Sequence, residues 1–312
     1  MMEKVQISVF RFDPTIHTKP YFDTFELETQ EGMTVLDAMH KLKEEFDGTL
    51  TFRRSCRSNI CGSCAARING QAILMCKTQV KDIAVDNTMK VEPLSNVRVV
   101  KDLVVDMDIF WEKIKSVQPW LSTGYPDTLP EKEFRMDASV VKEIDKTTDC
   151  IMCGICYSFC ESIHNNQKYF GPHVMAKTYR FVADTRDLLG PERAHRLIQS
   201  TGTALWLCVD CHNCEEFCPQ KVKVLESGYQ LRRAAYDLGI CHPGLIGAKK
   251  DLAGRGKLLE VSEFEGTMRN KYKIPQLLPS SESAVKIIEL CDKIKNEETA
   301  AKAGSADEKR GV

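Results

Sequence analysis

Long apolar runs and an excess of charge of one sign are both absent from this sequence of 312 residues. No stretch approaches the ~18 consecutive apolar residues that a membrane-spanning helix needs, and we expect no secretory signal at the N-terminus. Lysine and arginine number 43 against 44 aspartates and glutamates, and this balance argues against nucleic-acid binding. The 28% charged and 43% hydrophobic residues are ordinary for a globular chain and exclude a wholly disordered or fibrous one.

A glycine loop for nucleotide phosphates is missing as well. Gly62 and Gly70 belong to no G-x-G-x-x-G pattern, so we expect no nucleotide-dependent, substrate-converting site on this chain.

Cysteine, in contrast, is abundant: there are 14, of which all but Cys241 and Cys291 fall into three groups. The first group has the spacing C-x4-C-x2-C-x11-C, and the other two have C-x2-C-x2-C-x3-C. The groups are Cys56, Cys61, Cys64 and Cys76; Cys150, Cys153, Cys156 and Cys160; and Cys208, Cys211, Cys214 and Cys218.

Three kinds of chemistry use cysteines in such patterns. Disulfide frameworks are typical of secreted domains far shorter than this chain. Zinc sites of four cysteines use C-x2-C pairs, but a longer loop usually separates the two pairs. The C-x2-C-x2-C-x3-C-P run is typical of bacterial ferredoxins, and C-x4-C-x2-C…C of plant-type [2Fe–2S] ferredoxins. We therefore predict three iron–sulfur clusters and keep a structural zinc protein as the alternative.

The two ferredoxin runs also predict which cysteines share a cluster. In two-cluster ferredoxins the fourth cysteine of each run ligates the other cluster, so we expect the two runs to be crossed and their folding to be coupled to cluster assembly. The expected sets are a [2Fe–2S] cluster on Cys56, Cys61, Cys64 and Cys76; a [4Fe–4S] cluster on Cys150, Cys153, Cys156 and Cys218; and a second cluster on Cys160, Cys208, Cys211 and Cys214.

Residues 1–105 carry the pattern of a sheet with one helix. Alternation over residues 5–9 predicts a half-buried strand, and Phe25 and Leu27 suggest a second. Asn69-Gly70 is a strong hairpin signal between strands at 65–68 and 71–75. With a further short strand near residue 89, this is the order of the ubiquitin-like β-grasp of plant-type ferredoxins.

The helix of this first domain is expected to begin at Thr34. Asp37 stands three residues further on, where it can complete the cap. A stripe at helical spacing is expected to face the core; it consists of Val35, Met39, Leu42 and Phe46.

Residues 106–240 are expected to form an all-helical domain, because no useful strand alternation appears there. The predicted helices cover 106–118, 138–145, a stretch after Pro172, a stretch after Pro191, and 225–238. The fold class is therefore α+β, with a β-grasp domain followed by an α-helical ferredoxin domain. Residues 241–312 are expected to be a C-terminal extension with a short helix at 284–295 and a mobile tail.

A plant-type motif followed by two bacterial ferredoxin runs resembles the iron–sulfur subunit of succinate dehydrogenase and fumarate reductase. The resemblance covers about residues 4–240 and includes Arg53-Arg-Ser-Cys56-Arg-Ser-Asn-Ile-Cys61-Gly-Ser-Cys64, Lys101-Asp-Leu-Val-Val-Asp106 and Cys218-Pro219. It implies an electron-transfer subunit of a peripheral membrane complex. Cytosolic cluster assembly and the expected lack of a signal favour the cytoplasmic side, and the periplasmic face, reached by export together with a partner, is the alternative. The resemblance also implies an FAD-containing flavoprotein partner that interconverts succinate and fumarate, and a membrane anchor that links the chain to the quinone pool.

Two departures from ubiquinone-linked members point to another branch. Those members have a non-thiol residue where this chain has Cys211, so we expect a second [4Fe–4S] cluster here, with [3Fe–4S] as the alternative. After Cys160 this chain reads Glu161-Ser162 instead of the residues that help line the quinone pocket, and Val209 follows Cys208 where they have histidine. Both features resemble the non-classical branch, whose partner is a cysteine-rich subunit similar to part of heterodisulfide reductase.

Other functions are kept open. The chain is alternatively a subunit of a thiol-driven or methylmenaquinol-type fumarate reductase, or a free ferredoxin with several clusters. Arg53, Arg54 and Arg57 either dock a flavoprotein or tune the first cluster, or they form a solvated basic patch. His164 and His212 are expected to be surface or hydrogen-bonding residues, and the tryptophans Trp111, Trp120 and Trp206 to be core anchors.

Overall fold

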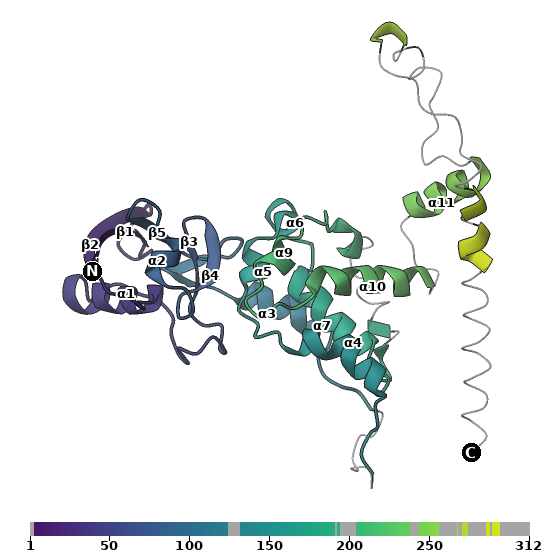
Figure 1. The fold of residues 1–312 in the computed structure, drawn as a ribbon, viewed down its shortest axis with the longest axis horizontal. Helices are drawn as coiled ribbons and strands as arrows, with labels where there is room; N and C mark the ends of the chain where they lie inside the picture. Colours follow the sequence, from purple (N-terminus) through teal and green to yellow (C-terminus); the bar gives the residue numbers. More distant parts are fainter. Residues whose placement is uncertain are drawn as a thin grey trace. The chain divides into compact units, whose positions relative to one another are not determined.

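The chain divides into two compact units, residues 1–240 and 241–312. In the first unit a sheet is followed along the chain by a set of helices (Figure 1). This order confirms the predicted α+β fold class. The computed structural model describes residues 3–123, 132–190, 192–193, 204–237, 243–255, 267, 270–273, 285–287 and 289–293.

Five strands form the sheet in the spatial order β2-β1-β5-β3-β4. The central pair β1 and β5 is parallel, and the other neighbours are antiparallel. Val5, Ile7 and Val9 of β1 are buried while Lys4 and Gln6 are exposed, so the predicted alternation is confirmed. The strands are β1 (Glu3–Arg11), β2 (Tyr21–Thr29), β3 (Ala65–Ile68), β4 (Gln71–Leu74) and β5 (Thr88–Glu92).

The helix α1 (Val35–Lys41) begins with a capping box. The Thr34 hydroxyl accepts a hydrogen bond from the Asp37 N–H, and the Asp37 carboxylate accepts one from the Thr34 N–H, each at 3.1 Å. Val35, Leu36 and Met39 are buried in one core with the sheet. The cap is therefore where the sequence predicted it.

The end of this helix departs from the prediction. The chain continues as a π-helix, η1 (Leu42–Phe46), in which the Asp47 N–H donates to the Leu42 carbonyl at 2.9 Å. The wider turn rotates Phe46 away from the core, and its side chain is 51% exposed. The expectation that Phe46 joins the apolar stripe is therefore wrong.

The hairpin between β3 and β4 is confirmed and positions two cysteines. Asn69 and Gly70 both have positive φ, 49° and 83°, as a two-residue turn of the primed type requires. Cys64 precedes β3 and Cys76 follows β4 by one residue, so antiparallel pairing brings both to the same end of the sheet. The Met75 N–H donates to the Cys64 carbonyl at 3.2 Å and closes that end.

Three further short elements were not predicted: α2 (Val80–Ile83), β6 (Val99–Lys101) and β7 (Val104–Val105).

Every element described in residues 106–240 is a helix, and three of the longer ones pack around one apolar core. Phe110, Tyr157, Met175 and Leu231 meet there, and α7 lies along α10 (Figure 1). The predicted helix after Pro191 lies almost wholly outside the described residues. The elements are α3 (Asp108–Lys115), α4 (Ala138–Thr148), α5 (Ile155–Ser158), α6 (Glu161–Asn165), α7 (Pro172–Val182), η2 (Ala204–Leu207), α9 (Asn213–Glu216) and α10 (Val224–Asp237).

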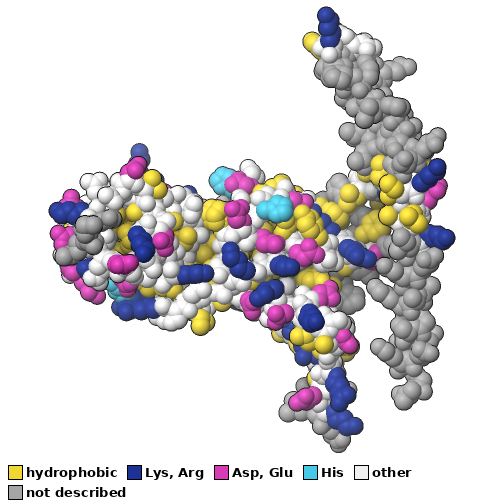
Figure 2. Space-filling view, viewed as in Figure 1, with side chains coloured by type: hydrophobic (Ala, Val, Ile, Leu, Met, Phe, Trp, Pro, Cys, Tyr) yellow, Lys and Arg dark blue, Asp and Glu magenta, His cyan; other side chains and the backbone are white. Residues whose placement is uncertain are grey.

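In the second unit, α11 (Pro243–Arg255) was not predicted. Lys249 on this helix forms an ion pair with Asp292 at 2.8 Å. Within the predicted helix at 284–295, residues 285–287 and 289–293 are helical, and the rest of it lies outside the described residues. No helix in the described ranges is both long and apolar enough to cross a bilayer, and acidic and basic side chains are interspersed over the visible face (Figure 2).

Candidate iron–sulfur sites

The first cysteine group lies in a loop whose backbone turns around its own sulfurs. The N–H groups of Ser58 and Cys61 each donate to Cys56 Sγ at 3.3 Å, and the Cys56 N–H lies 3.5 Å from Cys61 Sγ. Arg57 and Asn59 take positive φ values of 57° and 58°, which makes this tight course possible. Backbone donors aimed at sulfur are one of the means by which proteins set the potential of an iron–sulfur centre.

The four thiols of this group are close enough to affect one another's ionisation. Burial opposes ionisation of Cys61, but hydrogen bonds from Ser63 and Cys56 outweigh it and lower the pKa of Cys61 to about 6. Burial raises the pKa of Cys64 to about 12, and the neighbouring Cys76 and Cys61 add to that rise through their charge. Cys56 is exposed and Cys64 is buried, so the group extends from the surface to the core of the sheet domain.

The second group lines one hollow. A small cavity is bounded by Cys150, Cys153, Cys156 and Cys218 together with mostly apolar neighbours. Burial raises the pKa of Cys156 well above its usual value, and the charges of the other three cysteines act in the same direction. The Val222 N–H donates to Cys218 Sγ at 3.3 Å. A cysteine 58 residues further along the chain than Cys160 thus faces the first run.

The third group forms around Cys160. Burial raises the pKa of Cys160 to about 11, and Cys208 and Cys211 are close enough for their charges to contribute. Burial likewise raises the pKa of Cys214 to about 12, with contributions from Cys208, Cys160 and Cys211. The structure therefore brings Cys160 to the second run and Cys218 to the first, which is the crossed arrangement that the spacing predicts.

The two ferredoxin runs share a backbone course as well as a spacing. Met152 and Gly154 have φ values of 56° and 80°, and the matching Asp210 and His212 have 53° and 65°. A one-turn helix follows each pair, α5 in the first run and α9 in the second. Phe159 and Phe217, each placed directly before a fourth cysteine, stack with ring centroids 4.3 Å apart. The duplication seen in the sequence is thus a structural duplication.

The donor chemistry fits iron–sulfur centres. Each of the three groups offers four thiols and backbone N–H donors or an apolar wall, and thiolates are the ligands of [2Fe–2S] and [4Fe–4S] centres. All 13 cysteines in the described ranges are free of disulfides. In the same ranges no three or more His, Cys, Asp or Glu side chains are grouped so as to hold a single metal ion. Cys241 lies outside the described residues, and Cys291 is exposed in the second unit.

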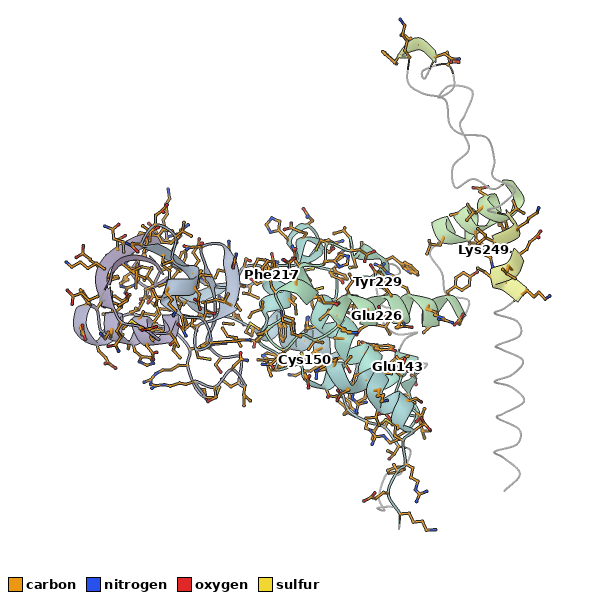
Figure 3. All side chains as sticks on the ribbon, in the orientation of Figure 1. Glu143, Cys150, Phe217, Glu226, Tyr229 and Lys249 are labelled. Atoms are coloured by element: carbon orange, nitrogen blue, oxygen red, sulfur yellow. The ribbon has the colours of Figure 1, made fainter. Side chains whose placement is uncertain are left out.

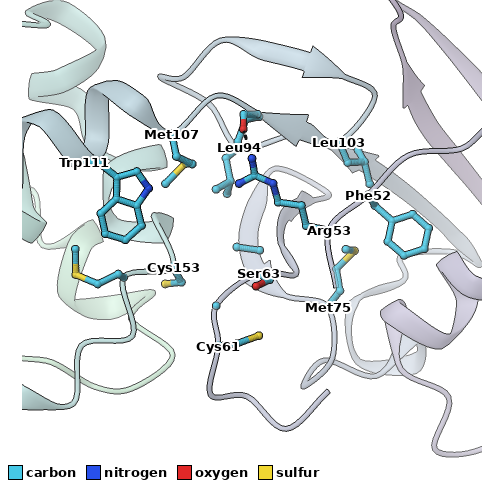
Figure 4. Close-up of a pocket in the computed structure, with 14 residues that line it drawn as sticks. Phe52, Arg53, Cys61, Ser63, Met75, Leu94, Leu103, Met107, Trp111 and Cys153 are labelled. Carbon is cyan, nitrogen blue, oxygen red and sulfur yellow. Dashed lines mark hydrogen bonds between the residues drawn. The ribbon is translucent and has the colours of Figure 1, made fainter. Parts of the chain in front are cut away.

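Contacts between the sheet and the helices connect the first two groups. They line a shared cavity, whose wall includes Cys61, Cys153, Met107 and Trp111 (Figure 4). A Cβ built on Gly62 would come within 2.8 Å of the Cα and Cβ of Cys153. The first cysteine loop thus rests directly on the second group.

Asn96 provides a second contact at this interface, which the sequence did not reveal. Its side-chain amide donates to the carbonyls of Tyr157, Ser158 and Cys160 at 3.0, 3.1 and 3.2 Å. Its partners lie more than 60 residues away along the chain, and no local pattern marks a contact of that range.

Three arginines surround the first loop and have different roles. Arg53 donates to the Val105 carbonyl at 2.8 Å and so ties the loop to β7. Arg54 and Arg57 are exposed. Burial lowers the pKa of His40, and the charges of Arg54 and Arg57 lower it further, so the two arginines place positive charge beside the loop.

The expectation that the tryptophans are core anchors is wrong for two of the three. Trp111 is 40% and Trp120 is 55% exposed, while Trp206 packs partly buried against the helical core. His164, in contrast, is a surface residue whose Nδ1 lies 3.3 Å from the Asn96 side-chain oxygen, as expected for a hydrogen-bonding histidine. His212 is exposed as well.

Comparison with known proteins gives two family matches, and several solved structures are similar as well. Residues 6–112 match the 2Fe-2S iron-sulfur cluster binding domain, and residues 146–222 match the 4Fe-4S dicluster domain. A chain of the Mycobacterium smegmatis Sdh1 complex in the apo form is 26% identical with a TM-score of 0.67, over 76% of this chain and 98% of that one. A hypothetical protein from Helicobacter pylori is 16% identical with a TM-score of 0.40, over 88% of this chain and 44% of that one.

The family matches favour iron–sulfur clusters over zinc, and they follow one another in the order that the cysteine motifs predict. The match to the Sdh1 complex extends over nearly the whole of the matched chain. This chain is therefore an iron–sulfur electron-transfer protein similar to the iron–sulfur subunit of succinate dehydrogenase, with a 2Fe–2S domain followed by a 4Fe–4S dicluster domain.

Proposed function

We propose that this chain relays single electrons between a flavoprotein that interconverts succinate and fumarate and a second, electron-exchanging partner. The observation that carries the proposal is the succession of the three cysteine groups. Cys61 and Cys153 line one cavity, and Cys156 lies close enough to Cys214 for the charge of one to affect the other. Three adjoining sites suit a relay, because a flavin delivers two electrons and iron–sulfur centres carry them one at a time.

The proposed ligand sets follow the grouping of the thiols. Cys211 belongs to the third set, since its charge acts on both Cys160 and Cys214. We propose [4Fe–4S] for this centre and keep [3Fe–4S], without Cys211, as the alternative. The sets are Cys56, Cys61, Cys64 and Cys76 for [2Fe–2S]; Cys150, Cys153, Cys156 and Cys218 for [4Fe–4S]; and Cys160, Cys208, Cys211 and Cys214 for the second cubane-type centre.

The proposed domains assign these centres to two parts of the chain. Residues 1–105 would hold the [2Fe–2S] centre, residues 106–240 the other two, and residues 241–312 would be an extension without ligands. Arg54 and Arg57 are exposed beside the first loop, and their charge supports docking of an acidic flavoprotein surface there.

The second partner is proposed to be a cysteine-rich subunit similar to part of heterodisulfide reductase, with a membrane anchor linked to the quinone pool as the alternative. The residues after Cys160 support the former: Glu161 and Ser162 begin the short helix α6, where ubiquinone-linked members carry residues of the quinone pocket. The match to the Sdh1 complex supports a membrane-associated assembly, for which we propose the cytoplasmic side.

Metal analysis with electron paramagnetic resonance (EPR) tests the ligand sets. We expect about ten iron atoms per anaerobically purified chain, acid-labile sulfide, and no strong [3Fe–4S] signal in the oxidised protein. In Cys211→Ser the iron should fall to about nine and that signal should appear. Nine iron atoms and the oxidised signal in the wild type would refute the role of Cys211, and zinc without sulfide would refute the clusters altogether.

Purification under native conditions tests the partners. An electron-transfer subunit should copurify with an FAD-containing protein that oxidises succinate or reduces fumarate, whereas a free ferredoxin would be isolated alone. Reduction of fumarate by thiols or by methylmenaquinol in the isolated complex would distinguish the alternative forms of fumarate reductase from a succinate dehydrogenase.

A further inference from the structure

At one matched position of the duplicated runs, an uncharged side chain next to the first cysteine of one run is replaced by a charged side chain in the other. In the first run Met152 places its Sδ 3.6 Å from Cys150 Sγ. In the second, Asp210 places its Oδ1 3.4 Å from Cys208 Sγ. The backbone is the same at both positions, with φ values of 56° and 53°. The same loop therefore presents a thioether to one cysteine and a carboxylate to the other.

A cation from α10 holds that carboxylate in place. Arg232 donates from Nη1 to Asp210 Oδ2 at 2.9 Å and from Nη2 to the Cys208 carbonyl at 3.1 Å. Its guanidinium lies 5.5 Å from the centre of the Trp206 ring, and the Arg232 side chain is only 17% exposed, whereas that of Asp210 is 38% exposed. The pair is thus fixed by two hydrogen bonds and is partly shielded from water, where charges act more strongly than at an open surface.

We propose that the Asp210–Arg232 ion pair sets the reduction potential of the centre that Cys208 helps to hold, an inference that rests on the proposed function. The Asp210 carboxylate disfavours an added electron on that centre and lowers its potential, and Arg232 opposes this effect. When Cys208 is a thiolate ligand it would have no proton to donate to Asp210, so repulsion between like charges would replace the hydrogen bond seen here.

The first run has no counterpart of this pair. Met152, at the position that matches Asp210, carries no charge, so it has no such effect on Cys150. The pair therefore distinguishes the two helical centres electrostatically.

If the ion pair has this role, two single variants should shift the reduction potential of the centre in opposite directions. In Asp210→Asn the unpaired Arg232 should raise the potential, and in Arg232→Gln the unpaired Asp210 should lower it. At a fixed applied potential each variant should change the ratio of reduced to oxidised centre about tenfold, which corresponds to about 59 mV for one electron. The double variant should lie between the two single ones.

The measurement is a redox titration followed by EPR on the full chain, together with any partner that copurifies, after iron and sulfide have been quantified. Asp210→Met gives a second test of the same charge, because the matched position of the first run already accommodates methionine. Glu226→Gln removes one negative charge from an exposed site on the same helix as Arg232, and it should leave the potential unchanged (Figure 3).

The possible results distinguish failure of this inference from failure of the proposed function. Fully loaded variants with the wild-type potential, or single variants that shift it in the same direction, would overturn the inference and leave the proposed function standing. A wild-type chain without iron and sulfide would overturn the proposed function and this inference with it.

Discussion

Replacing Gly62 by alanine should separate the first cysteine loop from the second group. Gly62 has a φ of +71°, and an alanine there would meet Cys153 Cα and Cβ at 2.8 Å and the Ile151 carbonyl oxygen at 3.2 Å. The left-handed backbone costs a residue with a Cβ about 1–2 kcal/mol, and overlap with a packed neighbour costs a further ~1–3 kcal/mol. We therefore expect Gly62→Ala to destabilise the interface by about 2–5 kcal/mol.

Hydrogen exchange across residues 150–154 measures this change, because loss of the contact exposes that segment without unfolding the whole chain. Gly70→Ala is the matched control: Gly70 has a φ of +83°, but nothing lies within 4 Å of its added Cβ. It should incur the backbone cost alone and leave exchange at 150–154 unchanged. Equal effects of the two substitutions on that segment would refute the close approach as the source of the contact.

Three other predictions follow from single side chains. Tyr169→Phe should lower the potential of the third centre. The buried hydroxyl donates to Met175 Sδ at 3.3 Å and also lies close enough to Cys208 to donate to its thiolate, and hydrogen bonds to sulfur favour the reduced state. An unchanged potential in a redox titration would exclude this effect. Asn96→Ala should cost about 1–3 kcal/mol in thermal unfolding, since three backbone carbonyls each lose one of their hydrogen bonds; an unchanged transition temperature would contradict this. Burial lowers the pKa of His173 to about 3, so the folded protein keeps this imidazole neutral while the unfolded chain protonates it below pH 6.5. Stability should therefore fall by about 2 kcal/mol from pH 6.5 to pH 5, and His173→Phe, which titrates no proton there, should reduce that fall in urea unfolding.

Local patterns in the sequence predicted the parts of the fold that depend on neighbouring residues. Asn69-Gly70 requires two positive φ values whatever surrounds it, and Thr34 and Asp37 cap a helix through their own hydrogen bonds. The strands β6 and β7 have three and two residues, too few for alternation to be recognised. Phe46 turned outward because the helix widened into a π-turn, which spacing at 3.6 residues per turn does not anticipate.

The candidate sites, too, could be predicted from the sequence only in part. The cysteine spacing predicted three groups and the exchange between the two runs, because ligand spacing follows from the cluster that the loop must enclose. The surroundings of the groups were not predictable. Asn96, Gly62 and Arg232 act on residues that are distant in sequence, and Asp210 is unremarkable until the structure places its carboxylate beside Cys208.

The exchange of Cys160 and Cys218 between the two runs has a consequence for synthesis on the ribosome. The thiols around the hairpin are all present once Cys76 has emerged, so that site can close while most of the chain is still untranslated. The cavity lined by Cys150 lacks part of its wall until Cys218 appears, and the group around Cys160 is complete only when Cys214 has been made. Metal loading of the nascent chain is therefore expected to occur early for one site and late, and nearly together, for the other two.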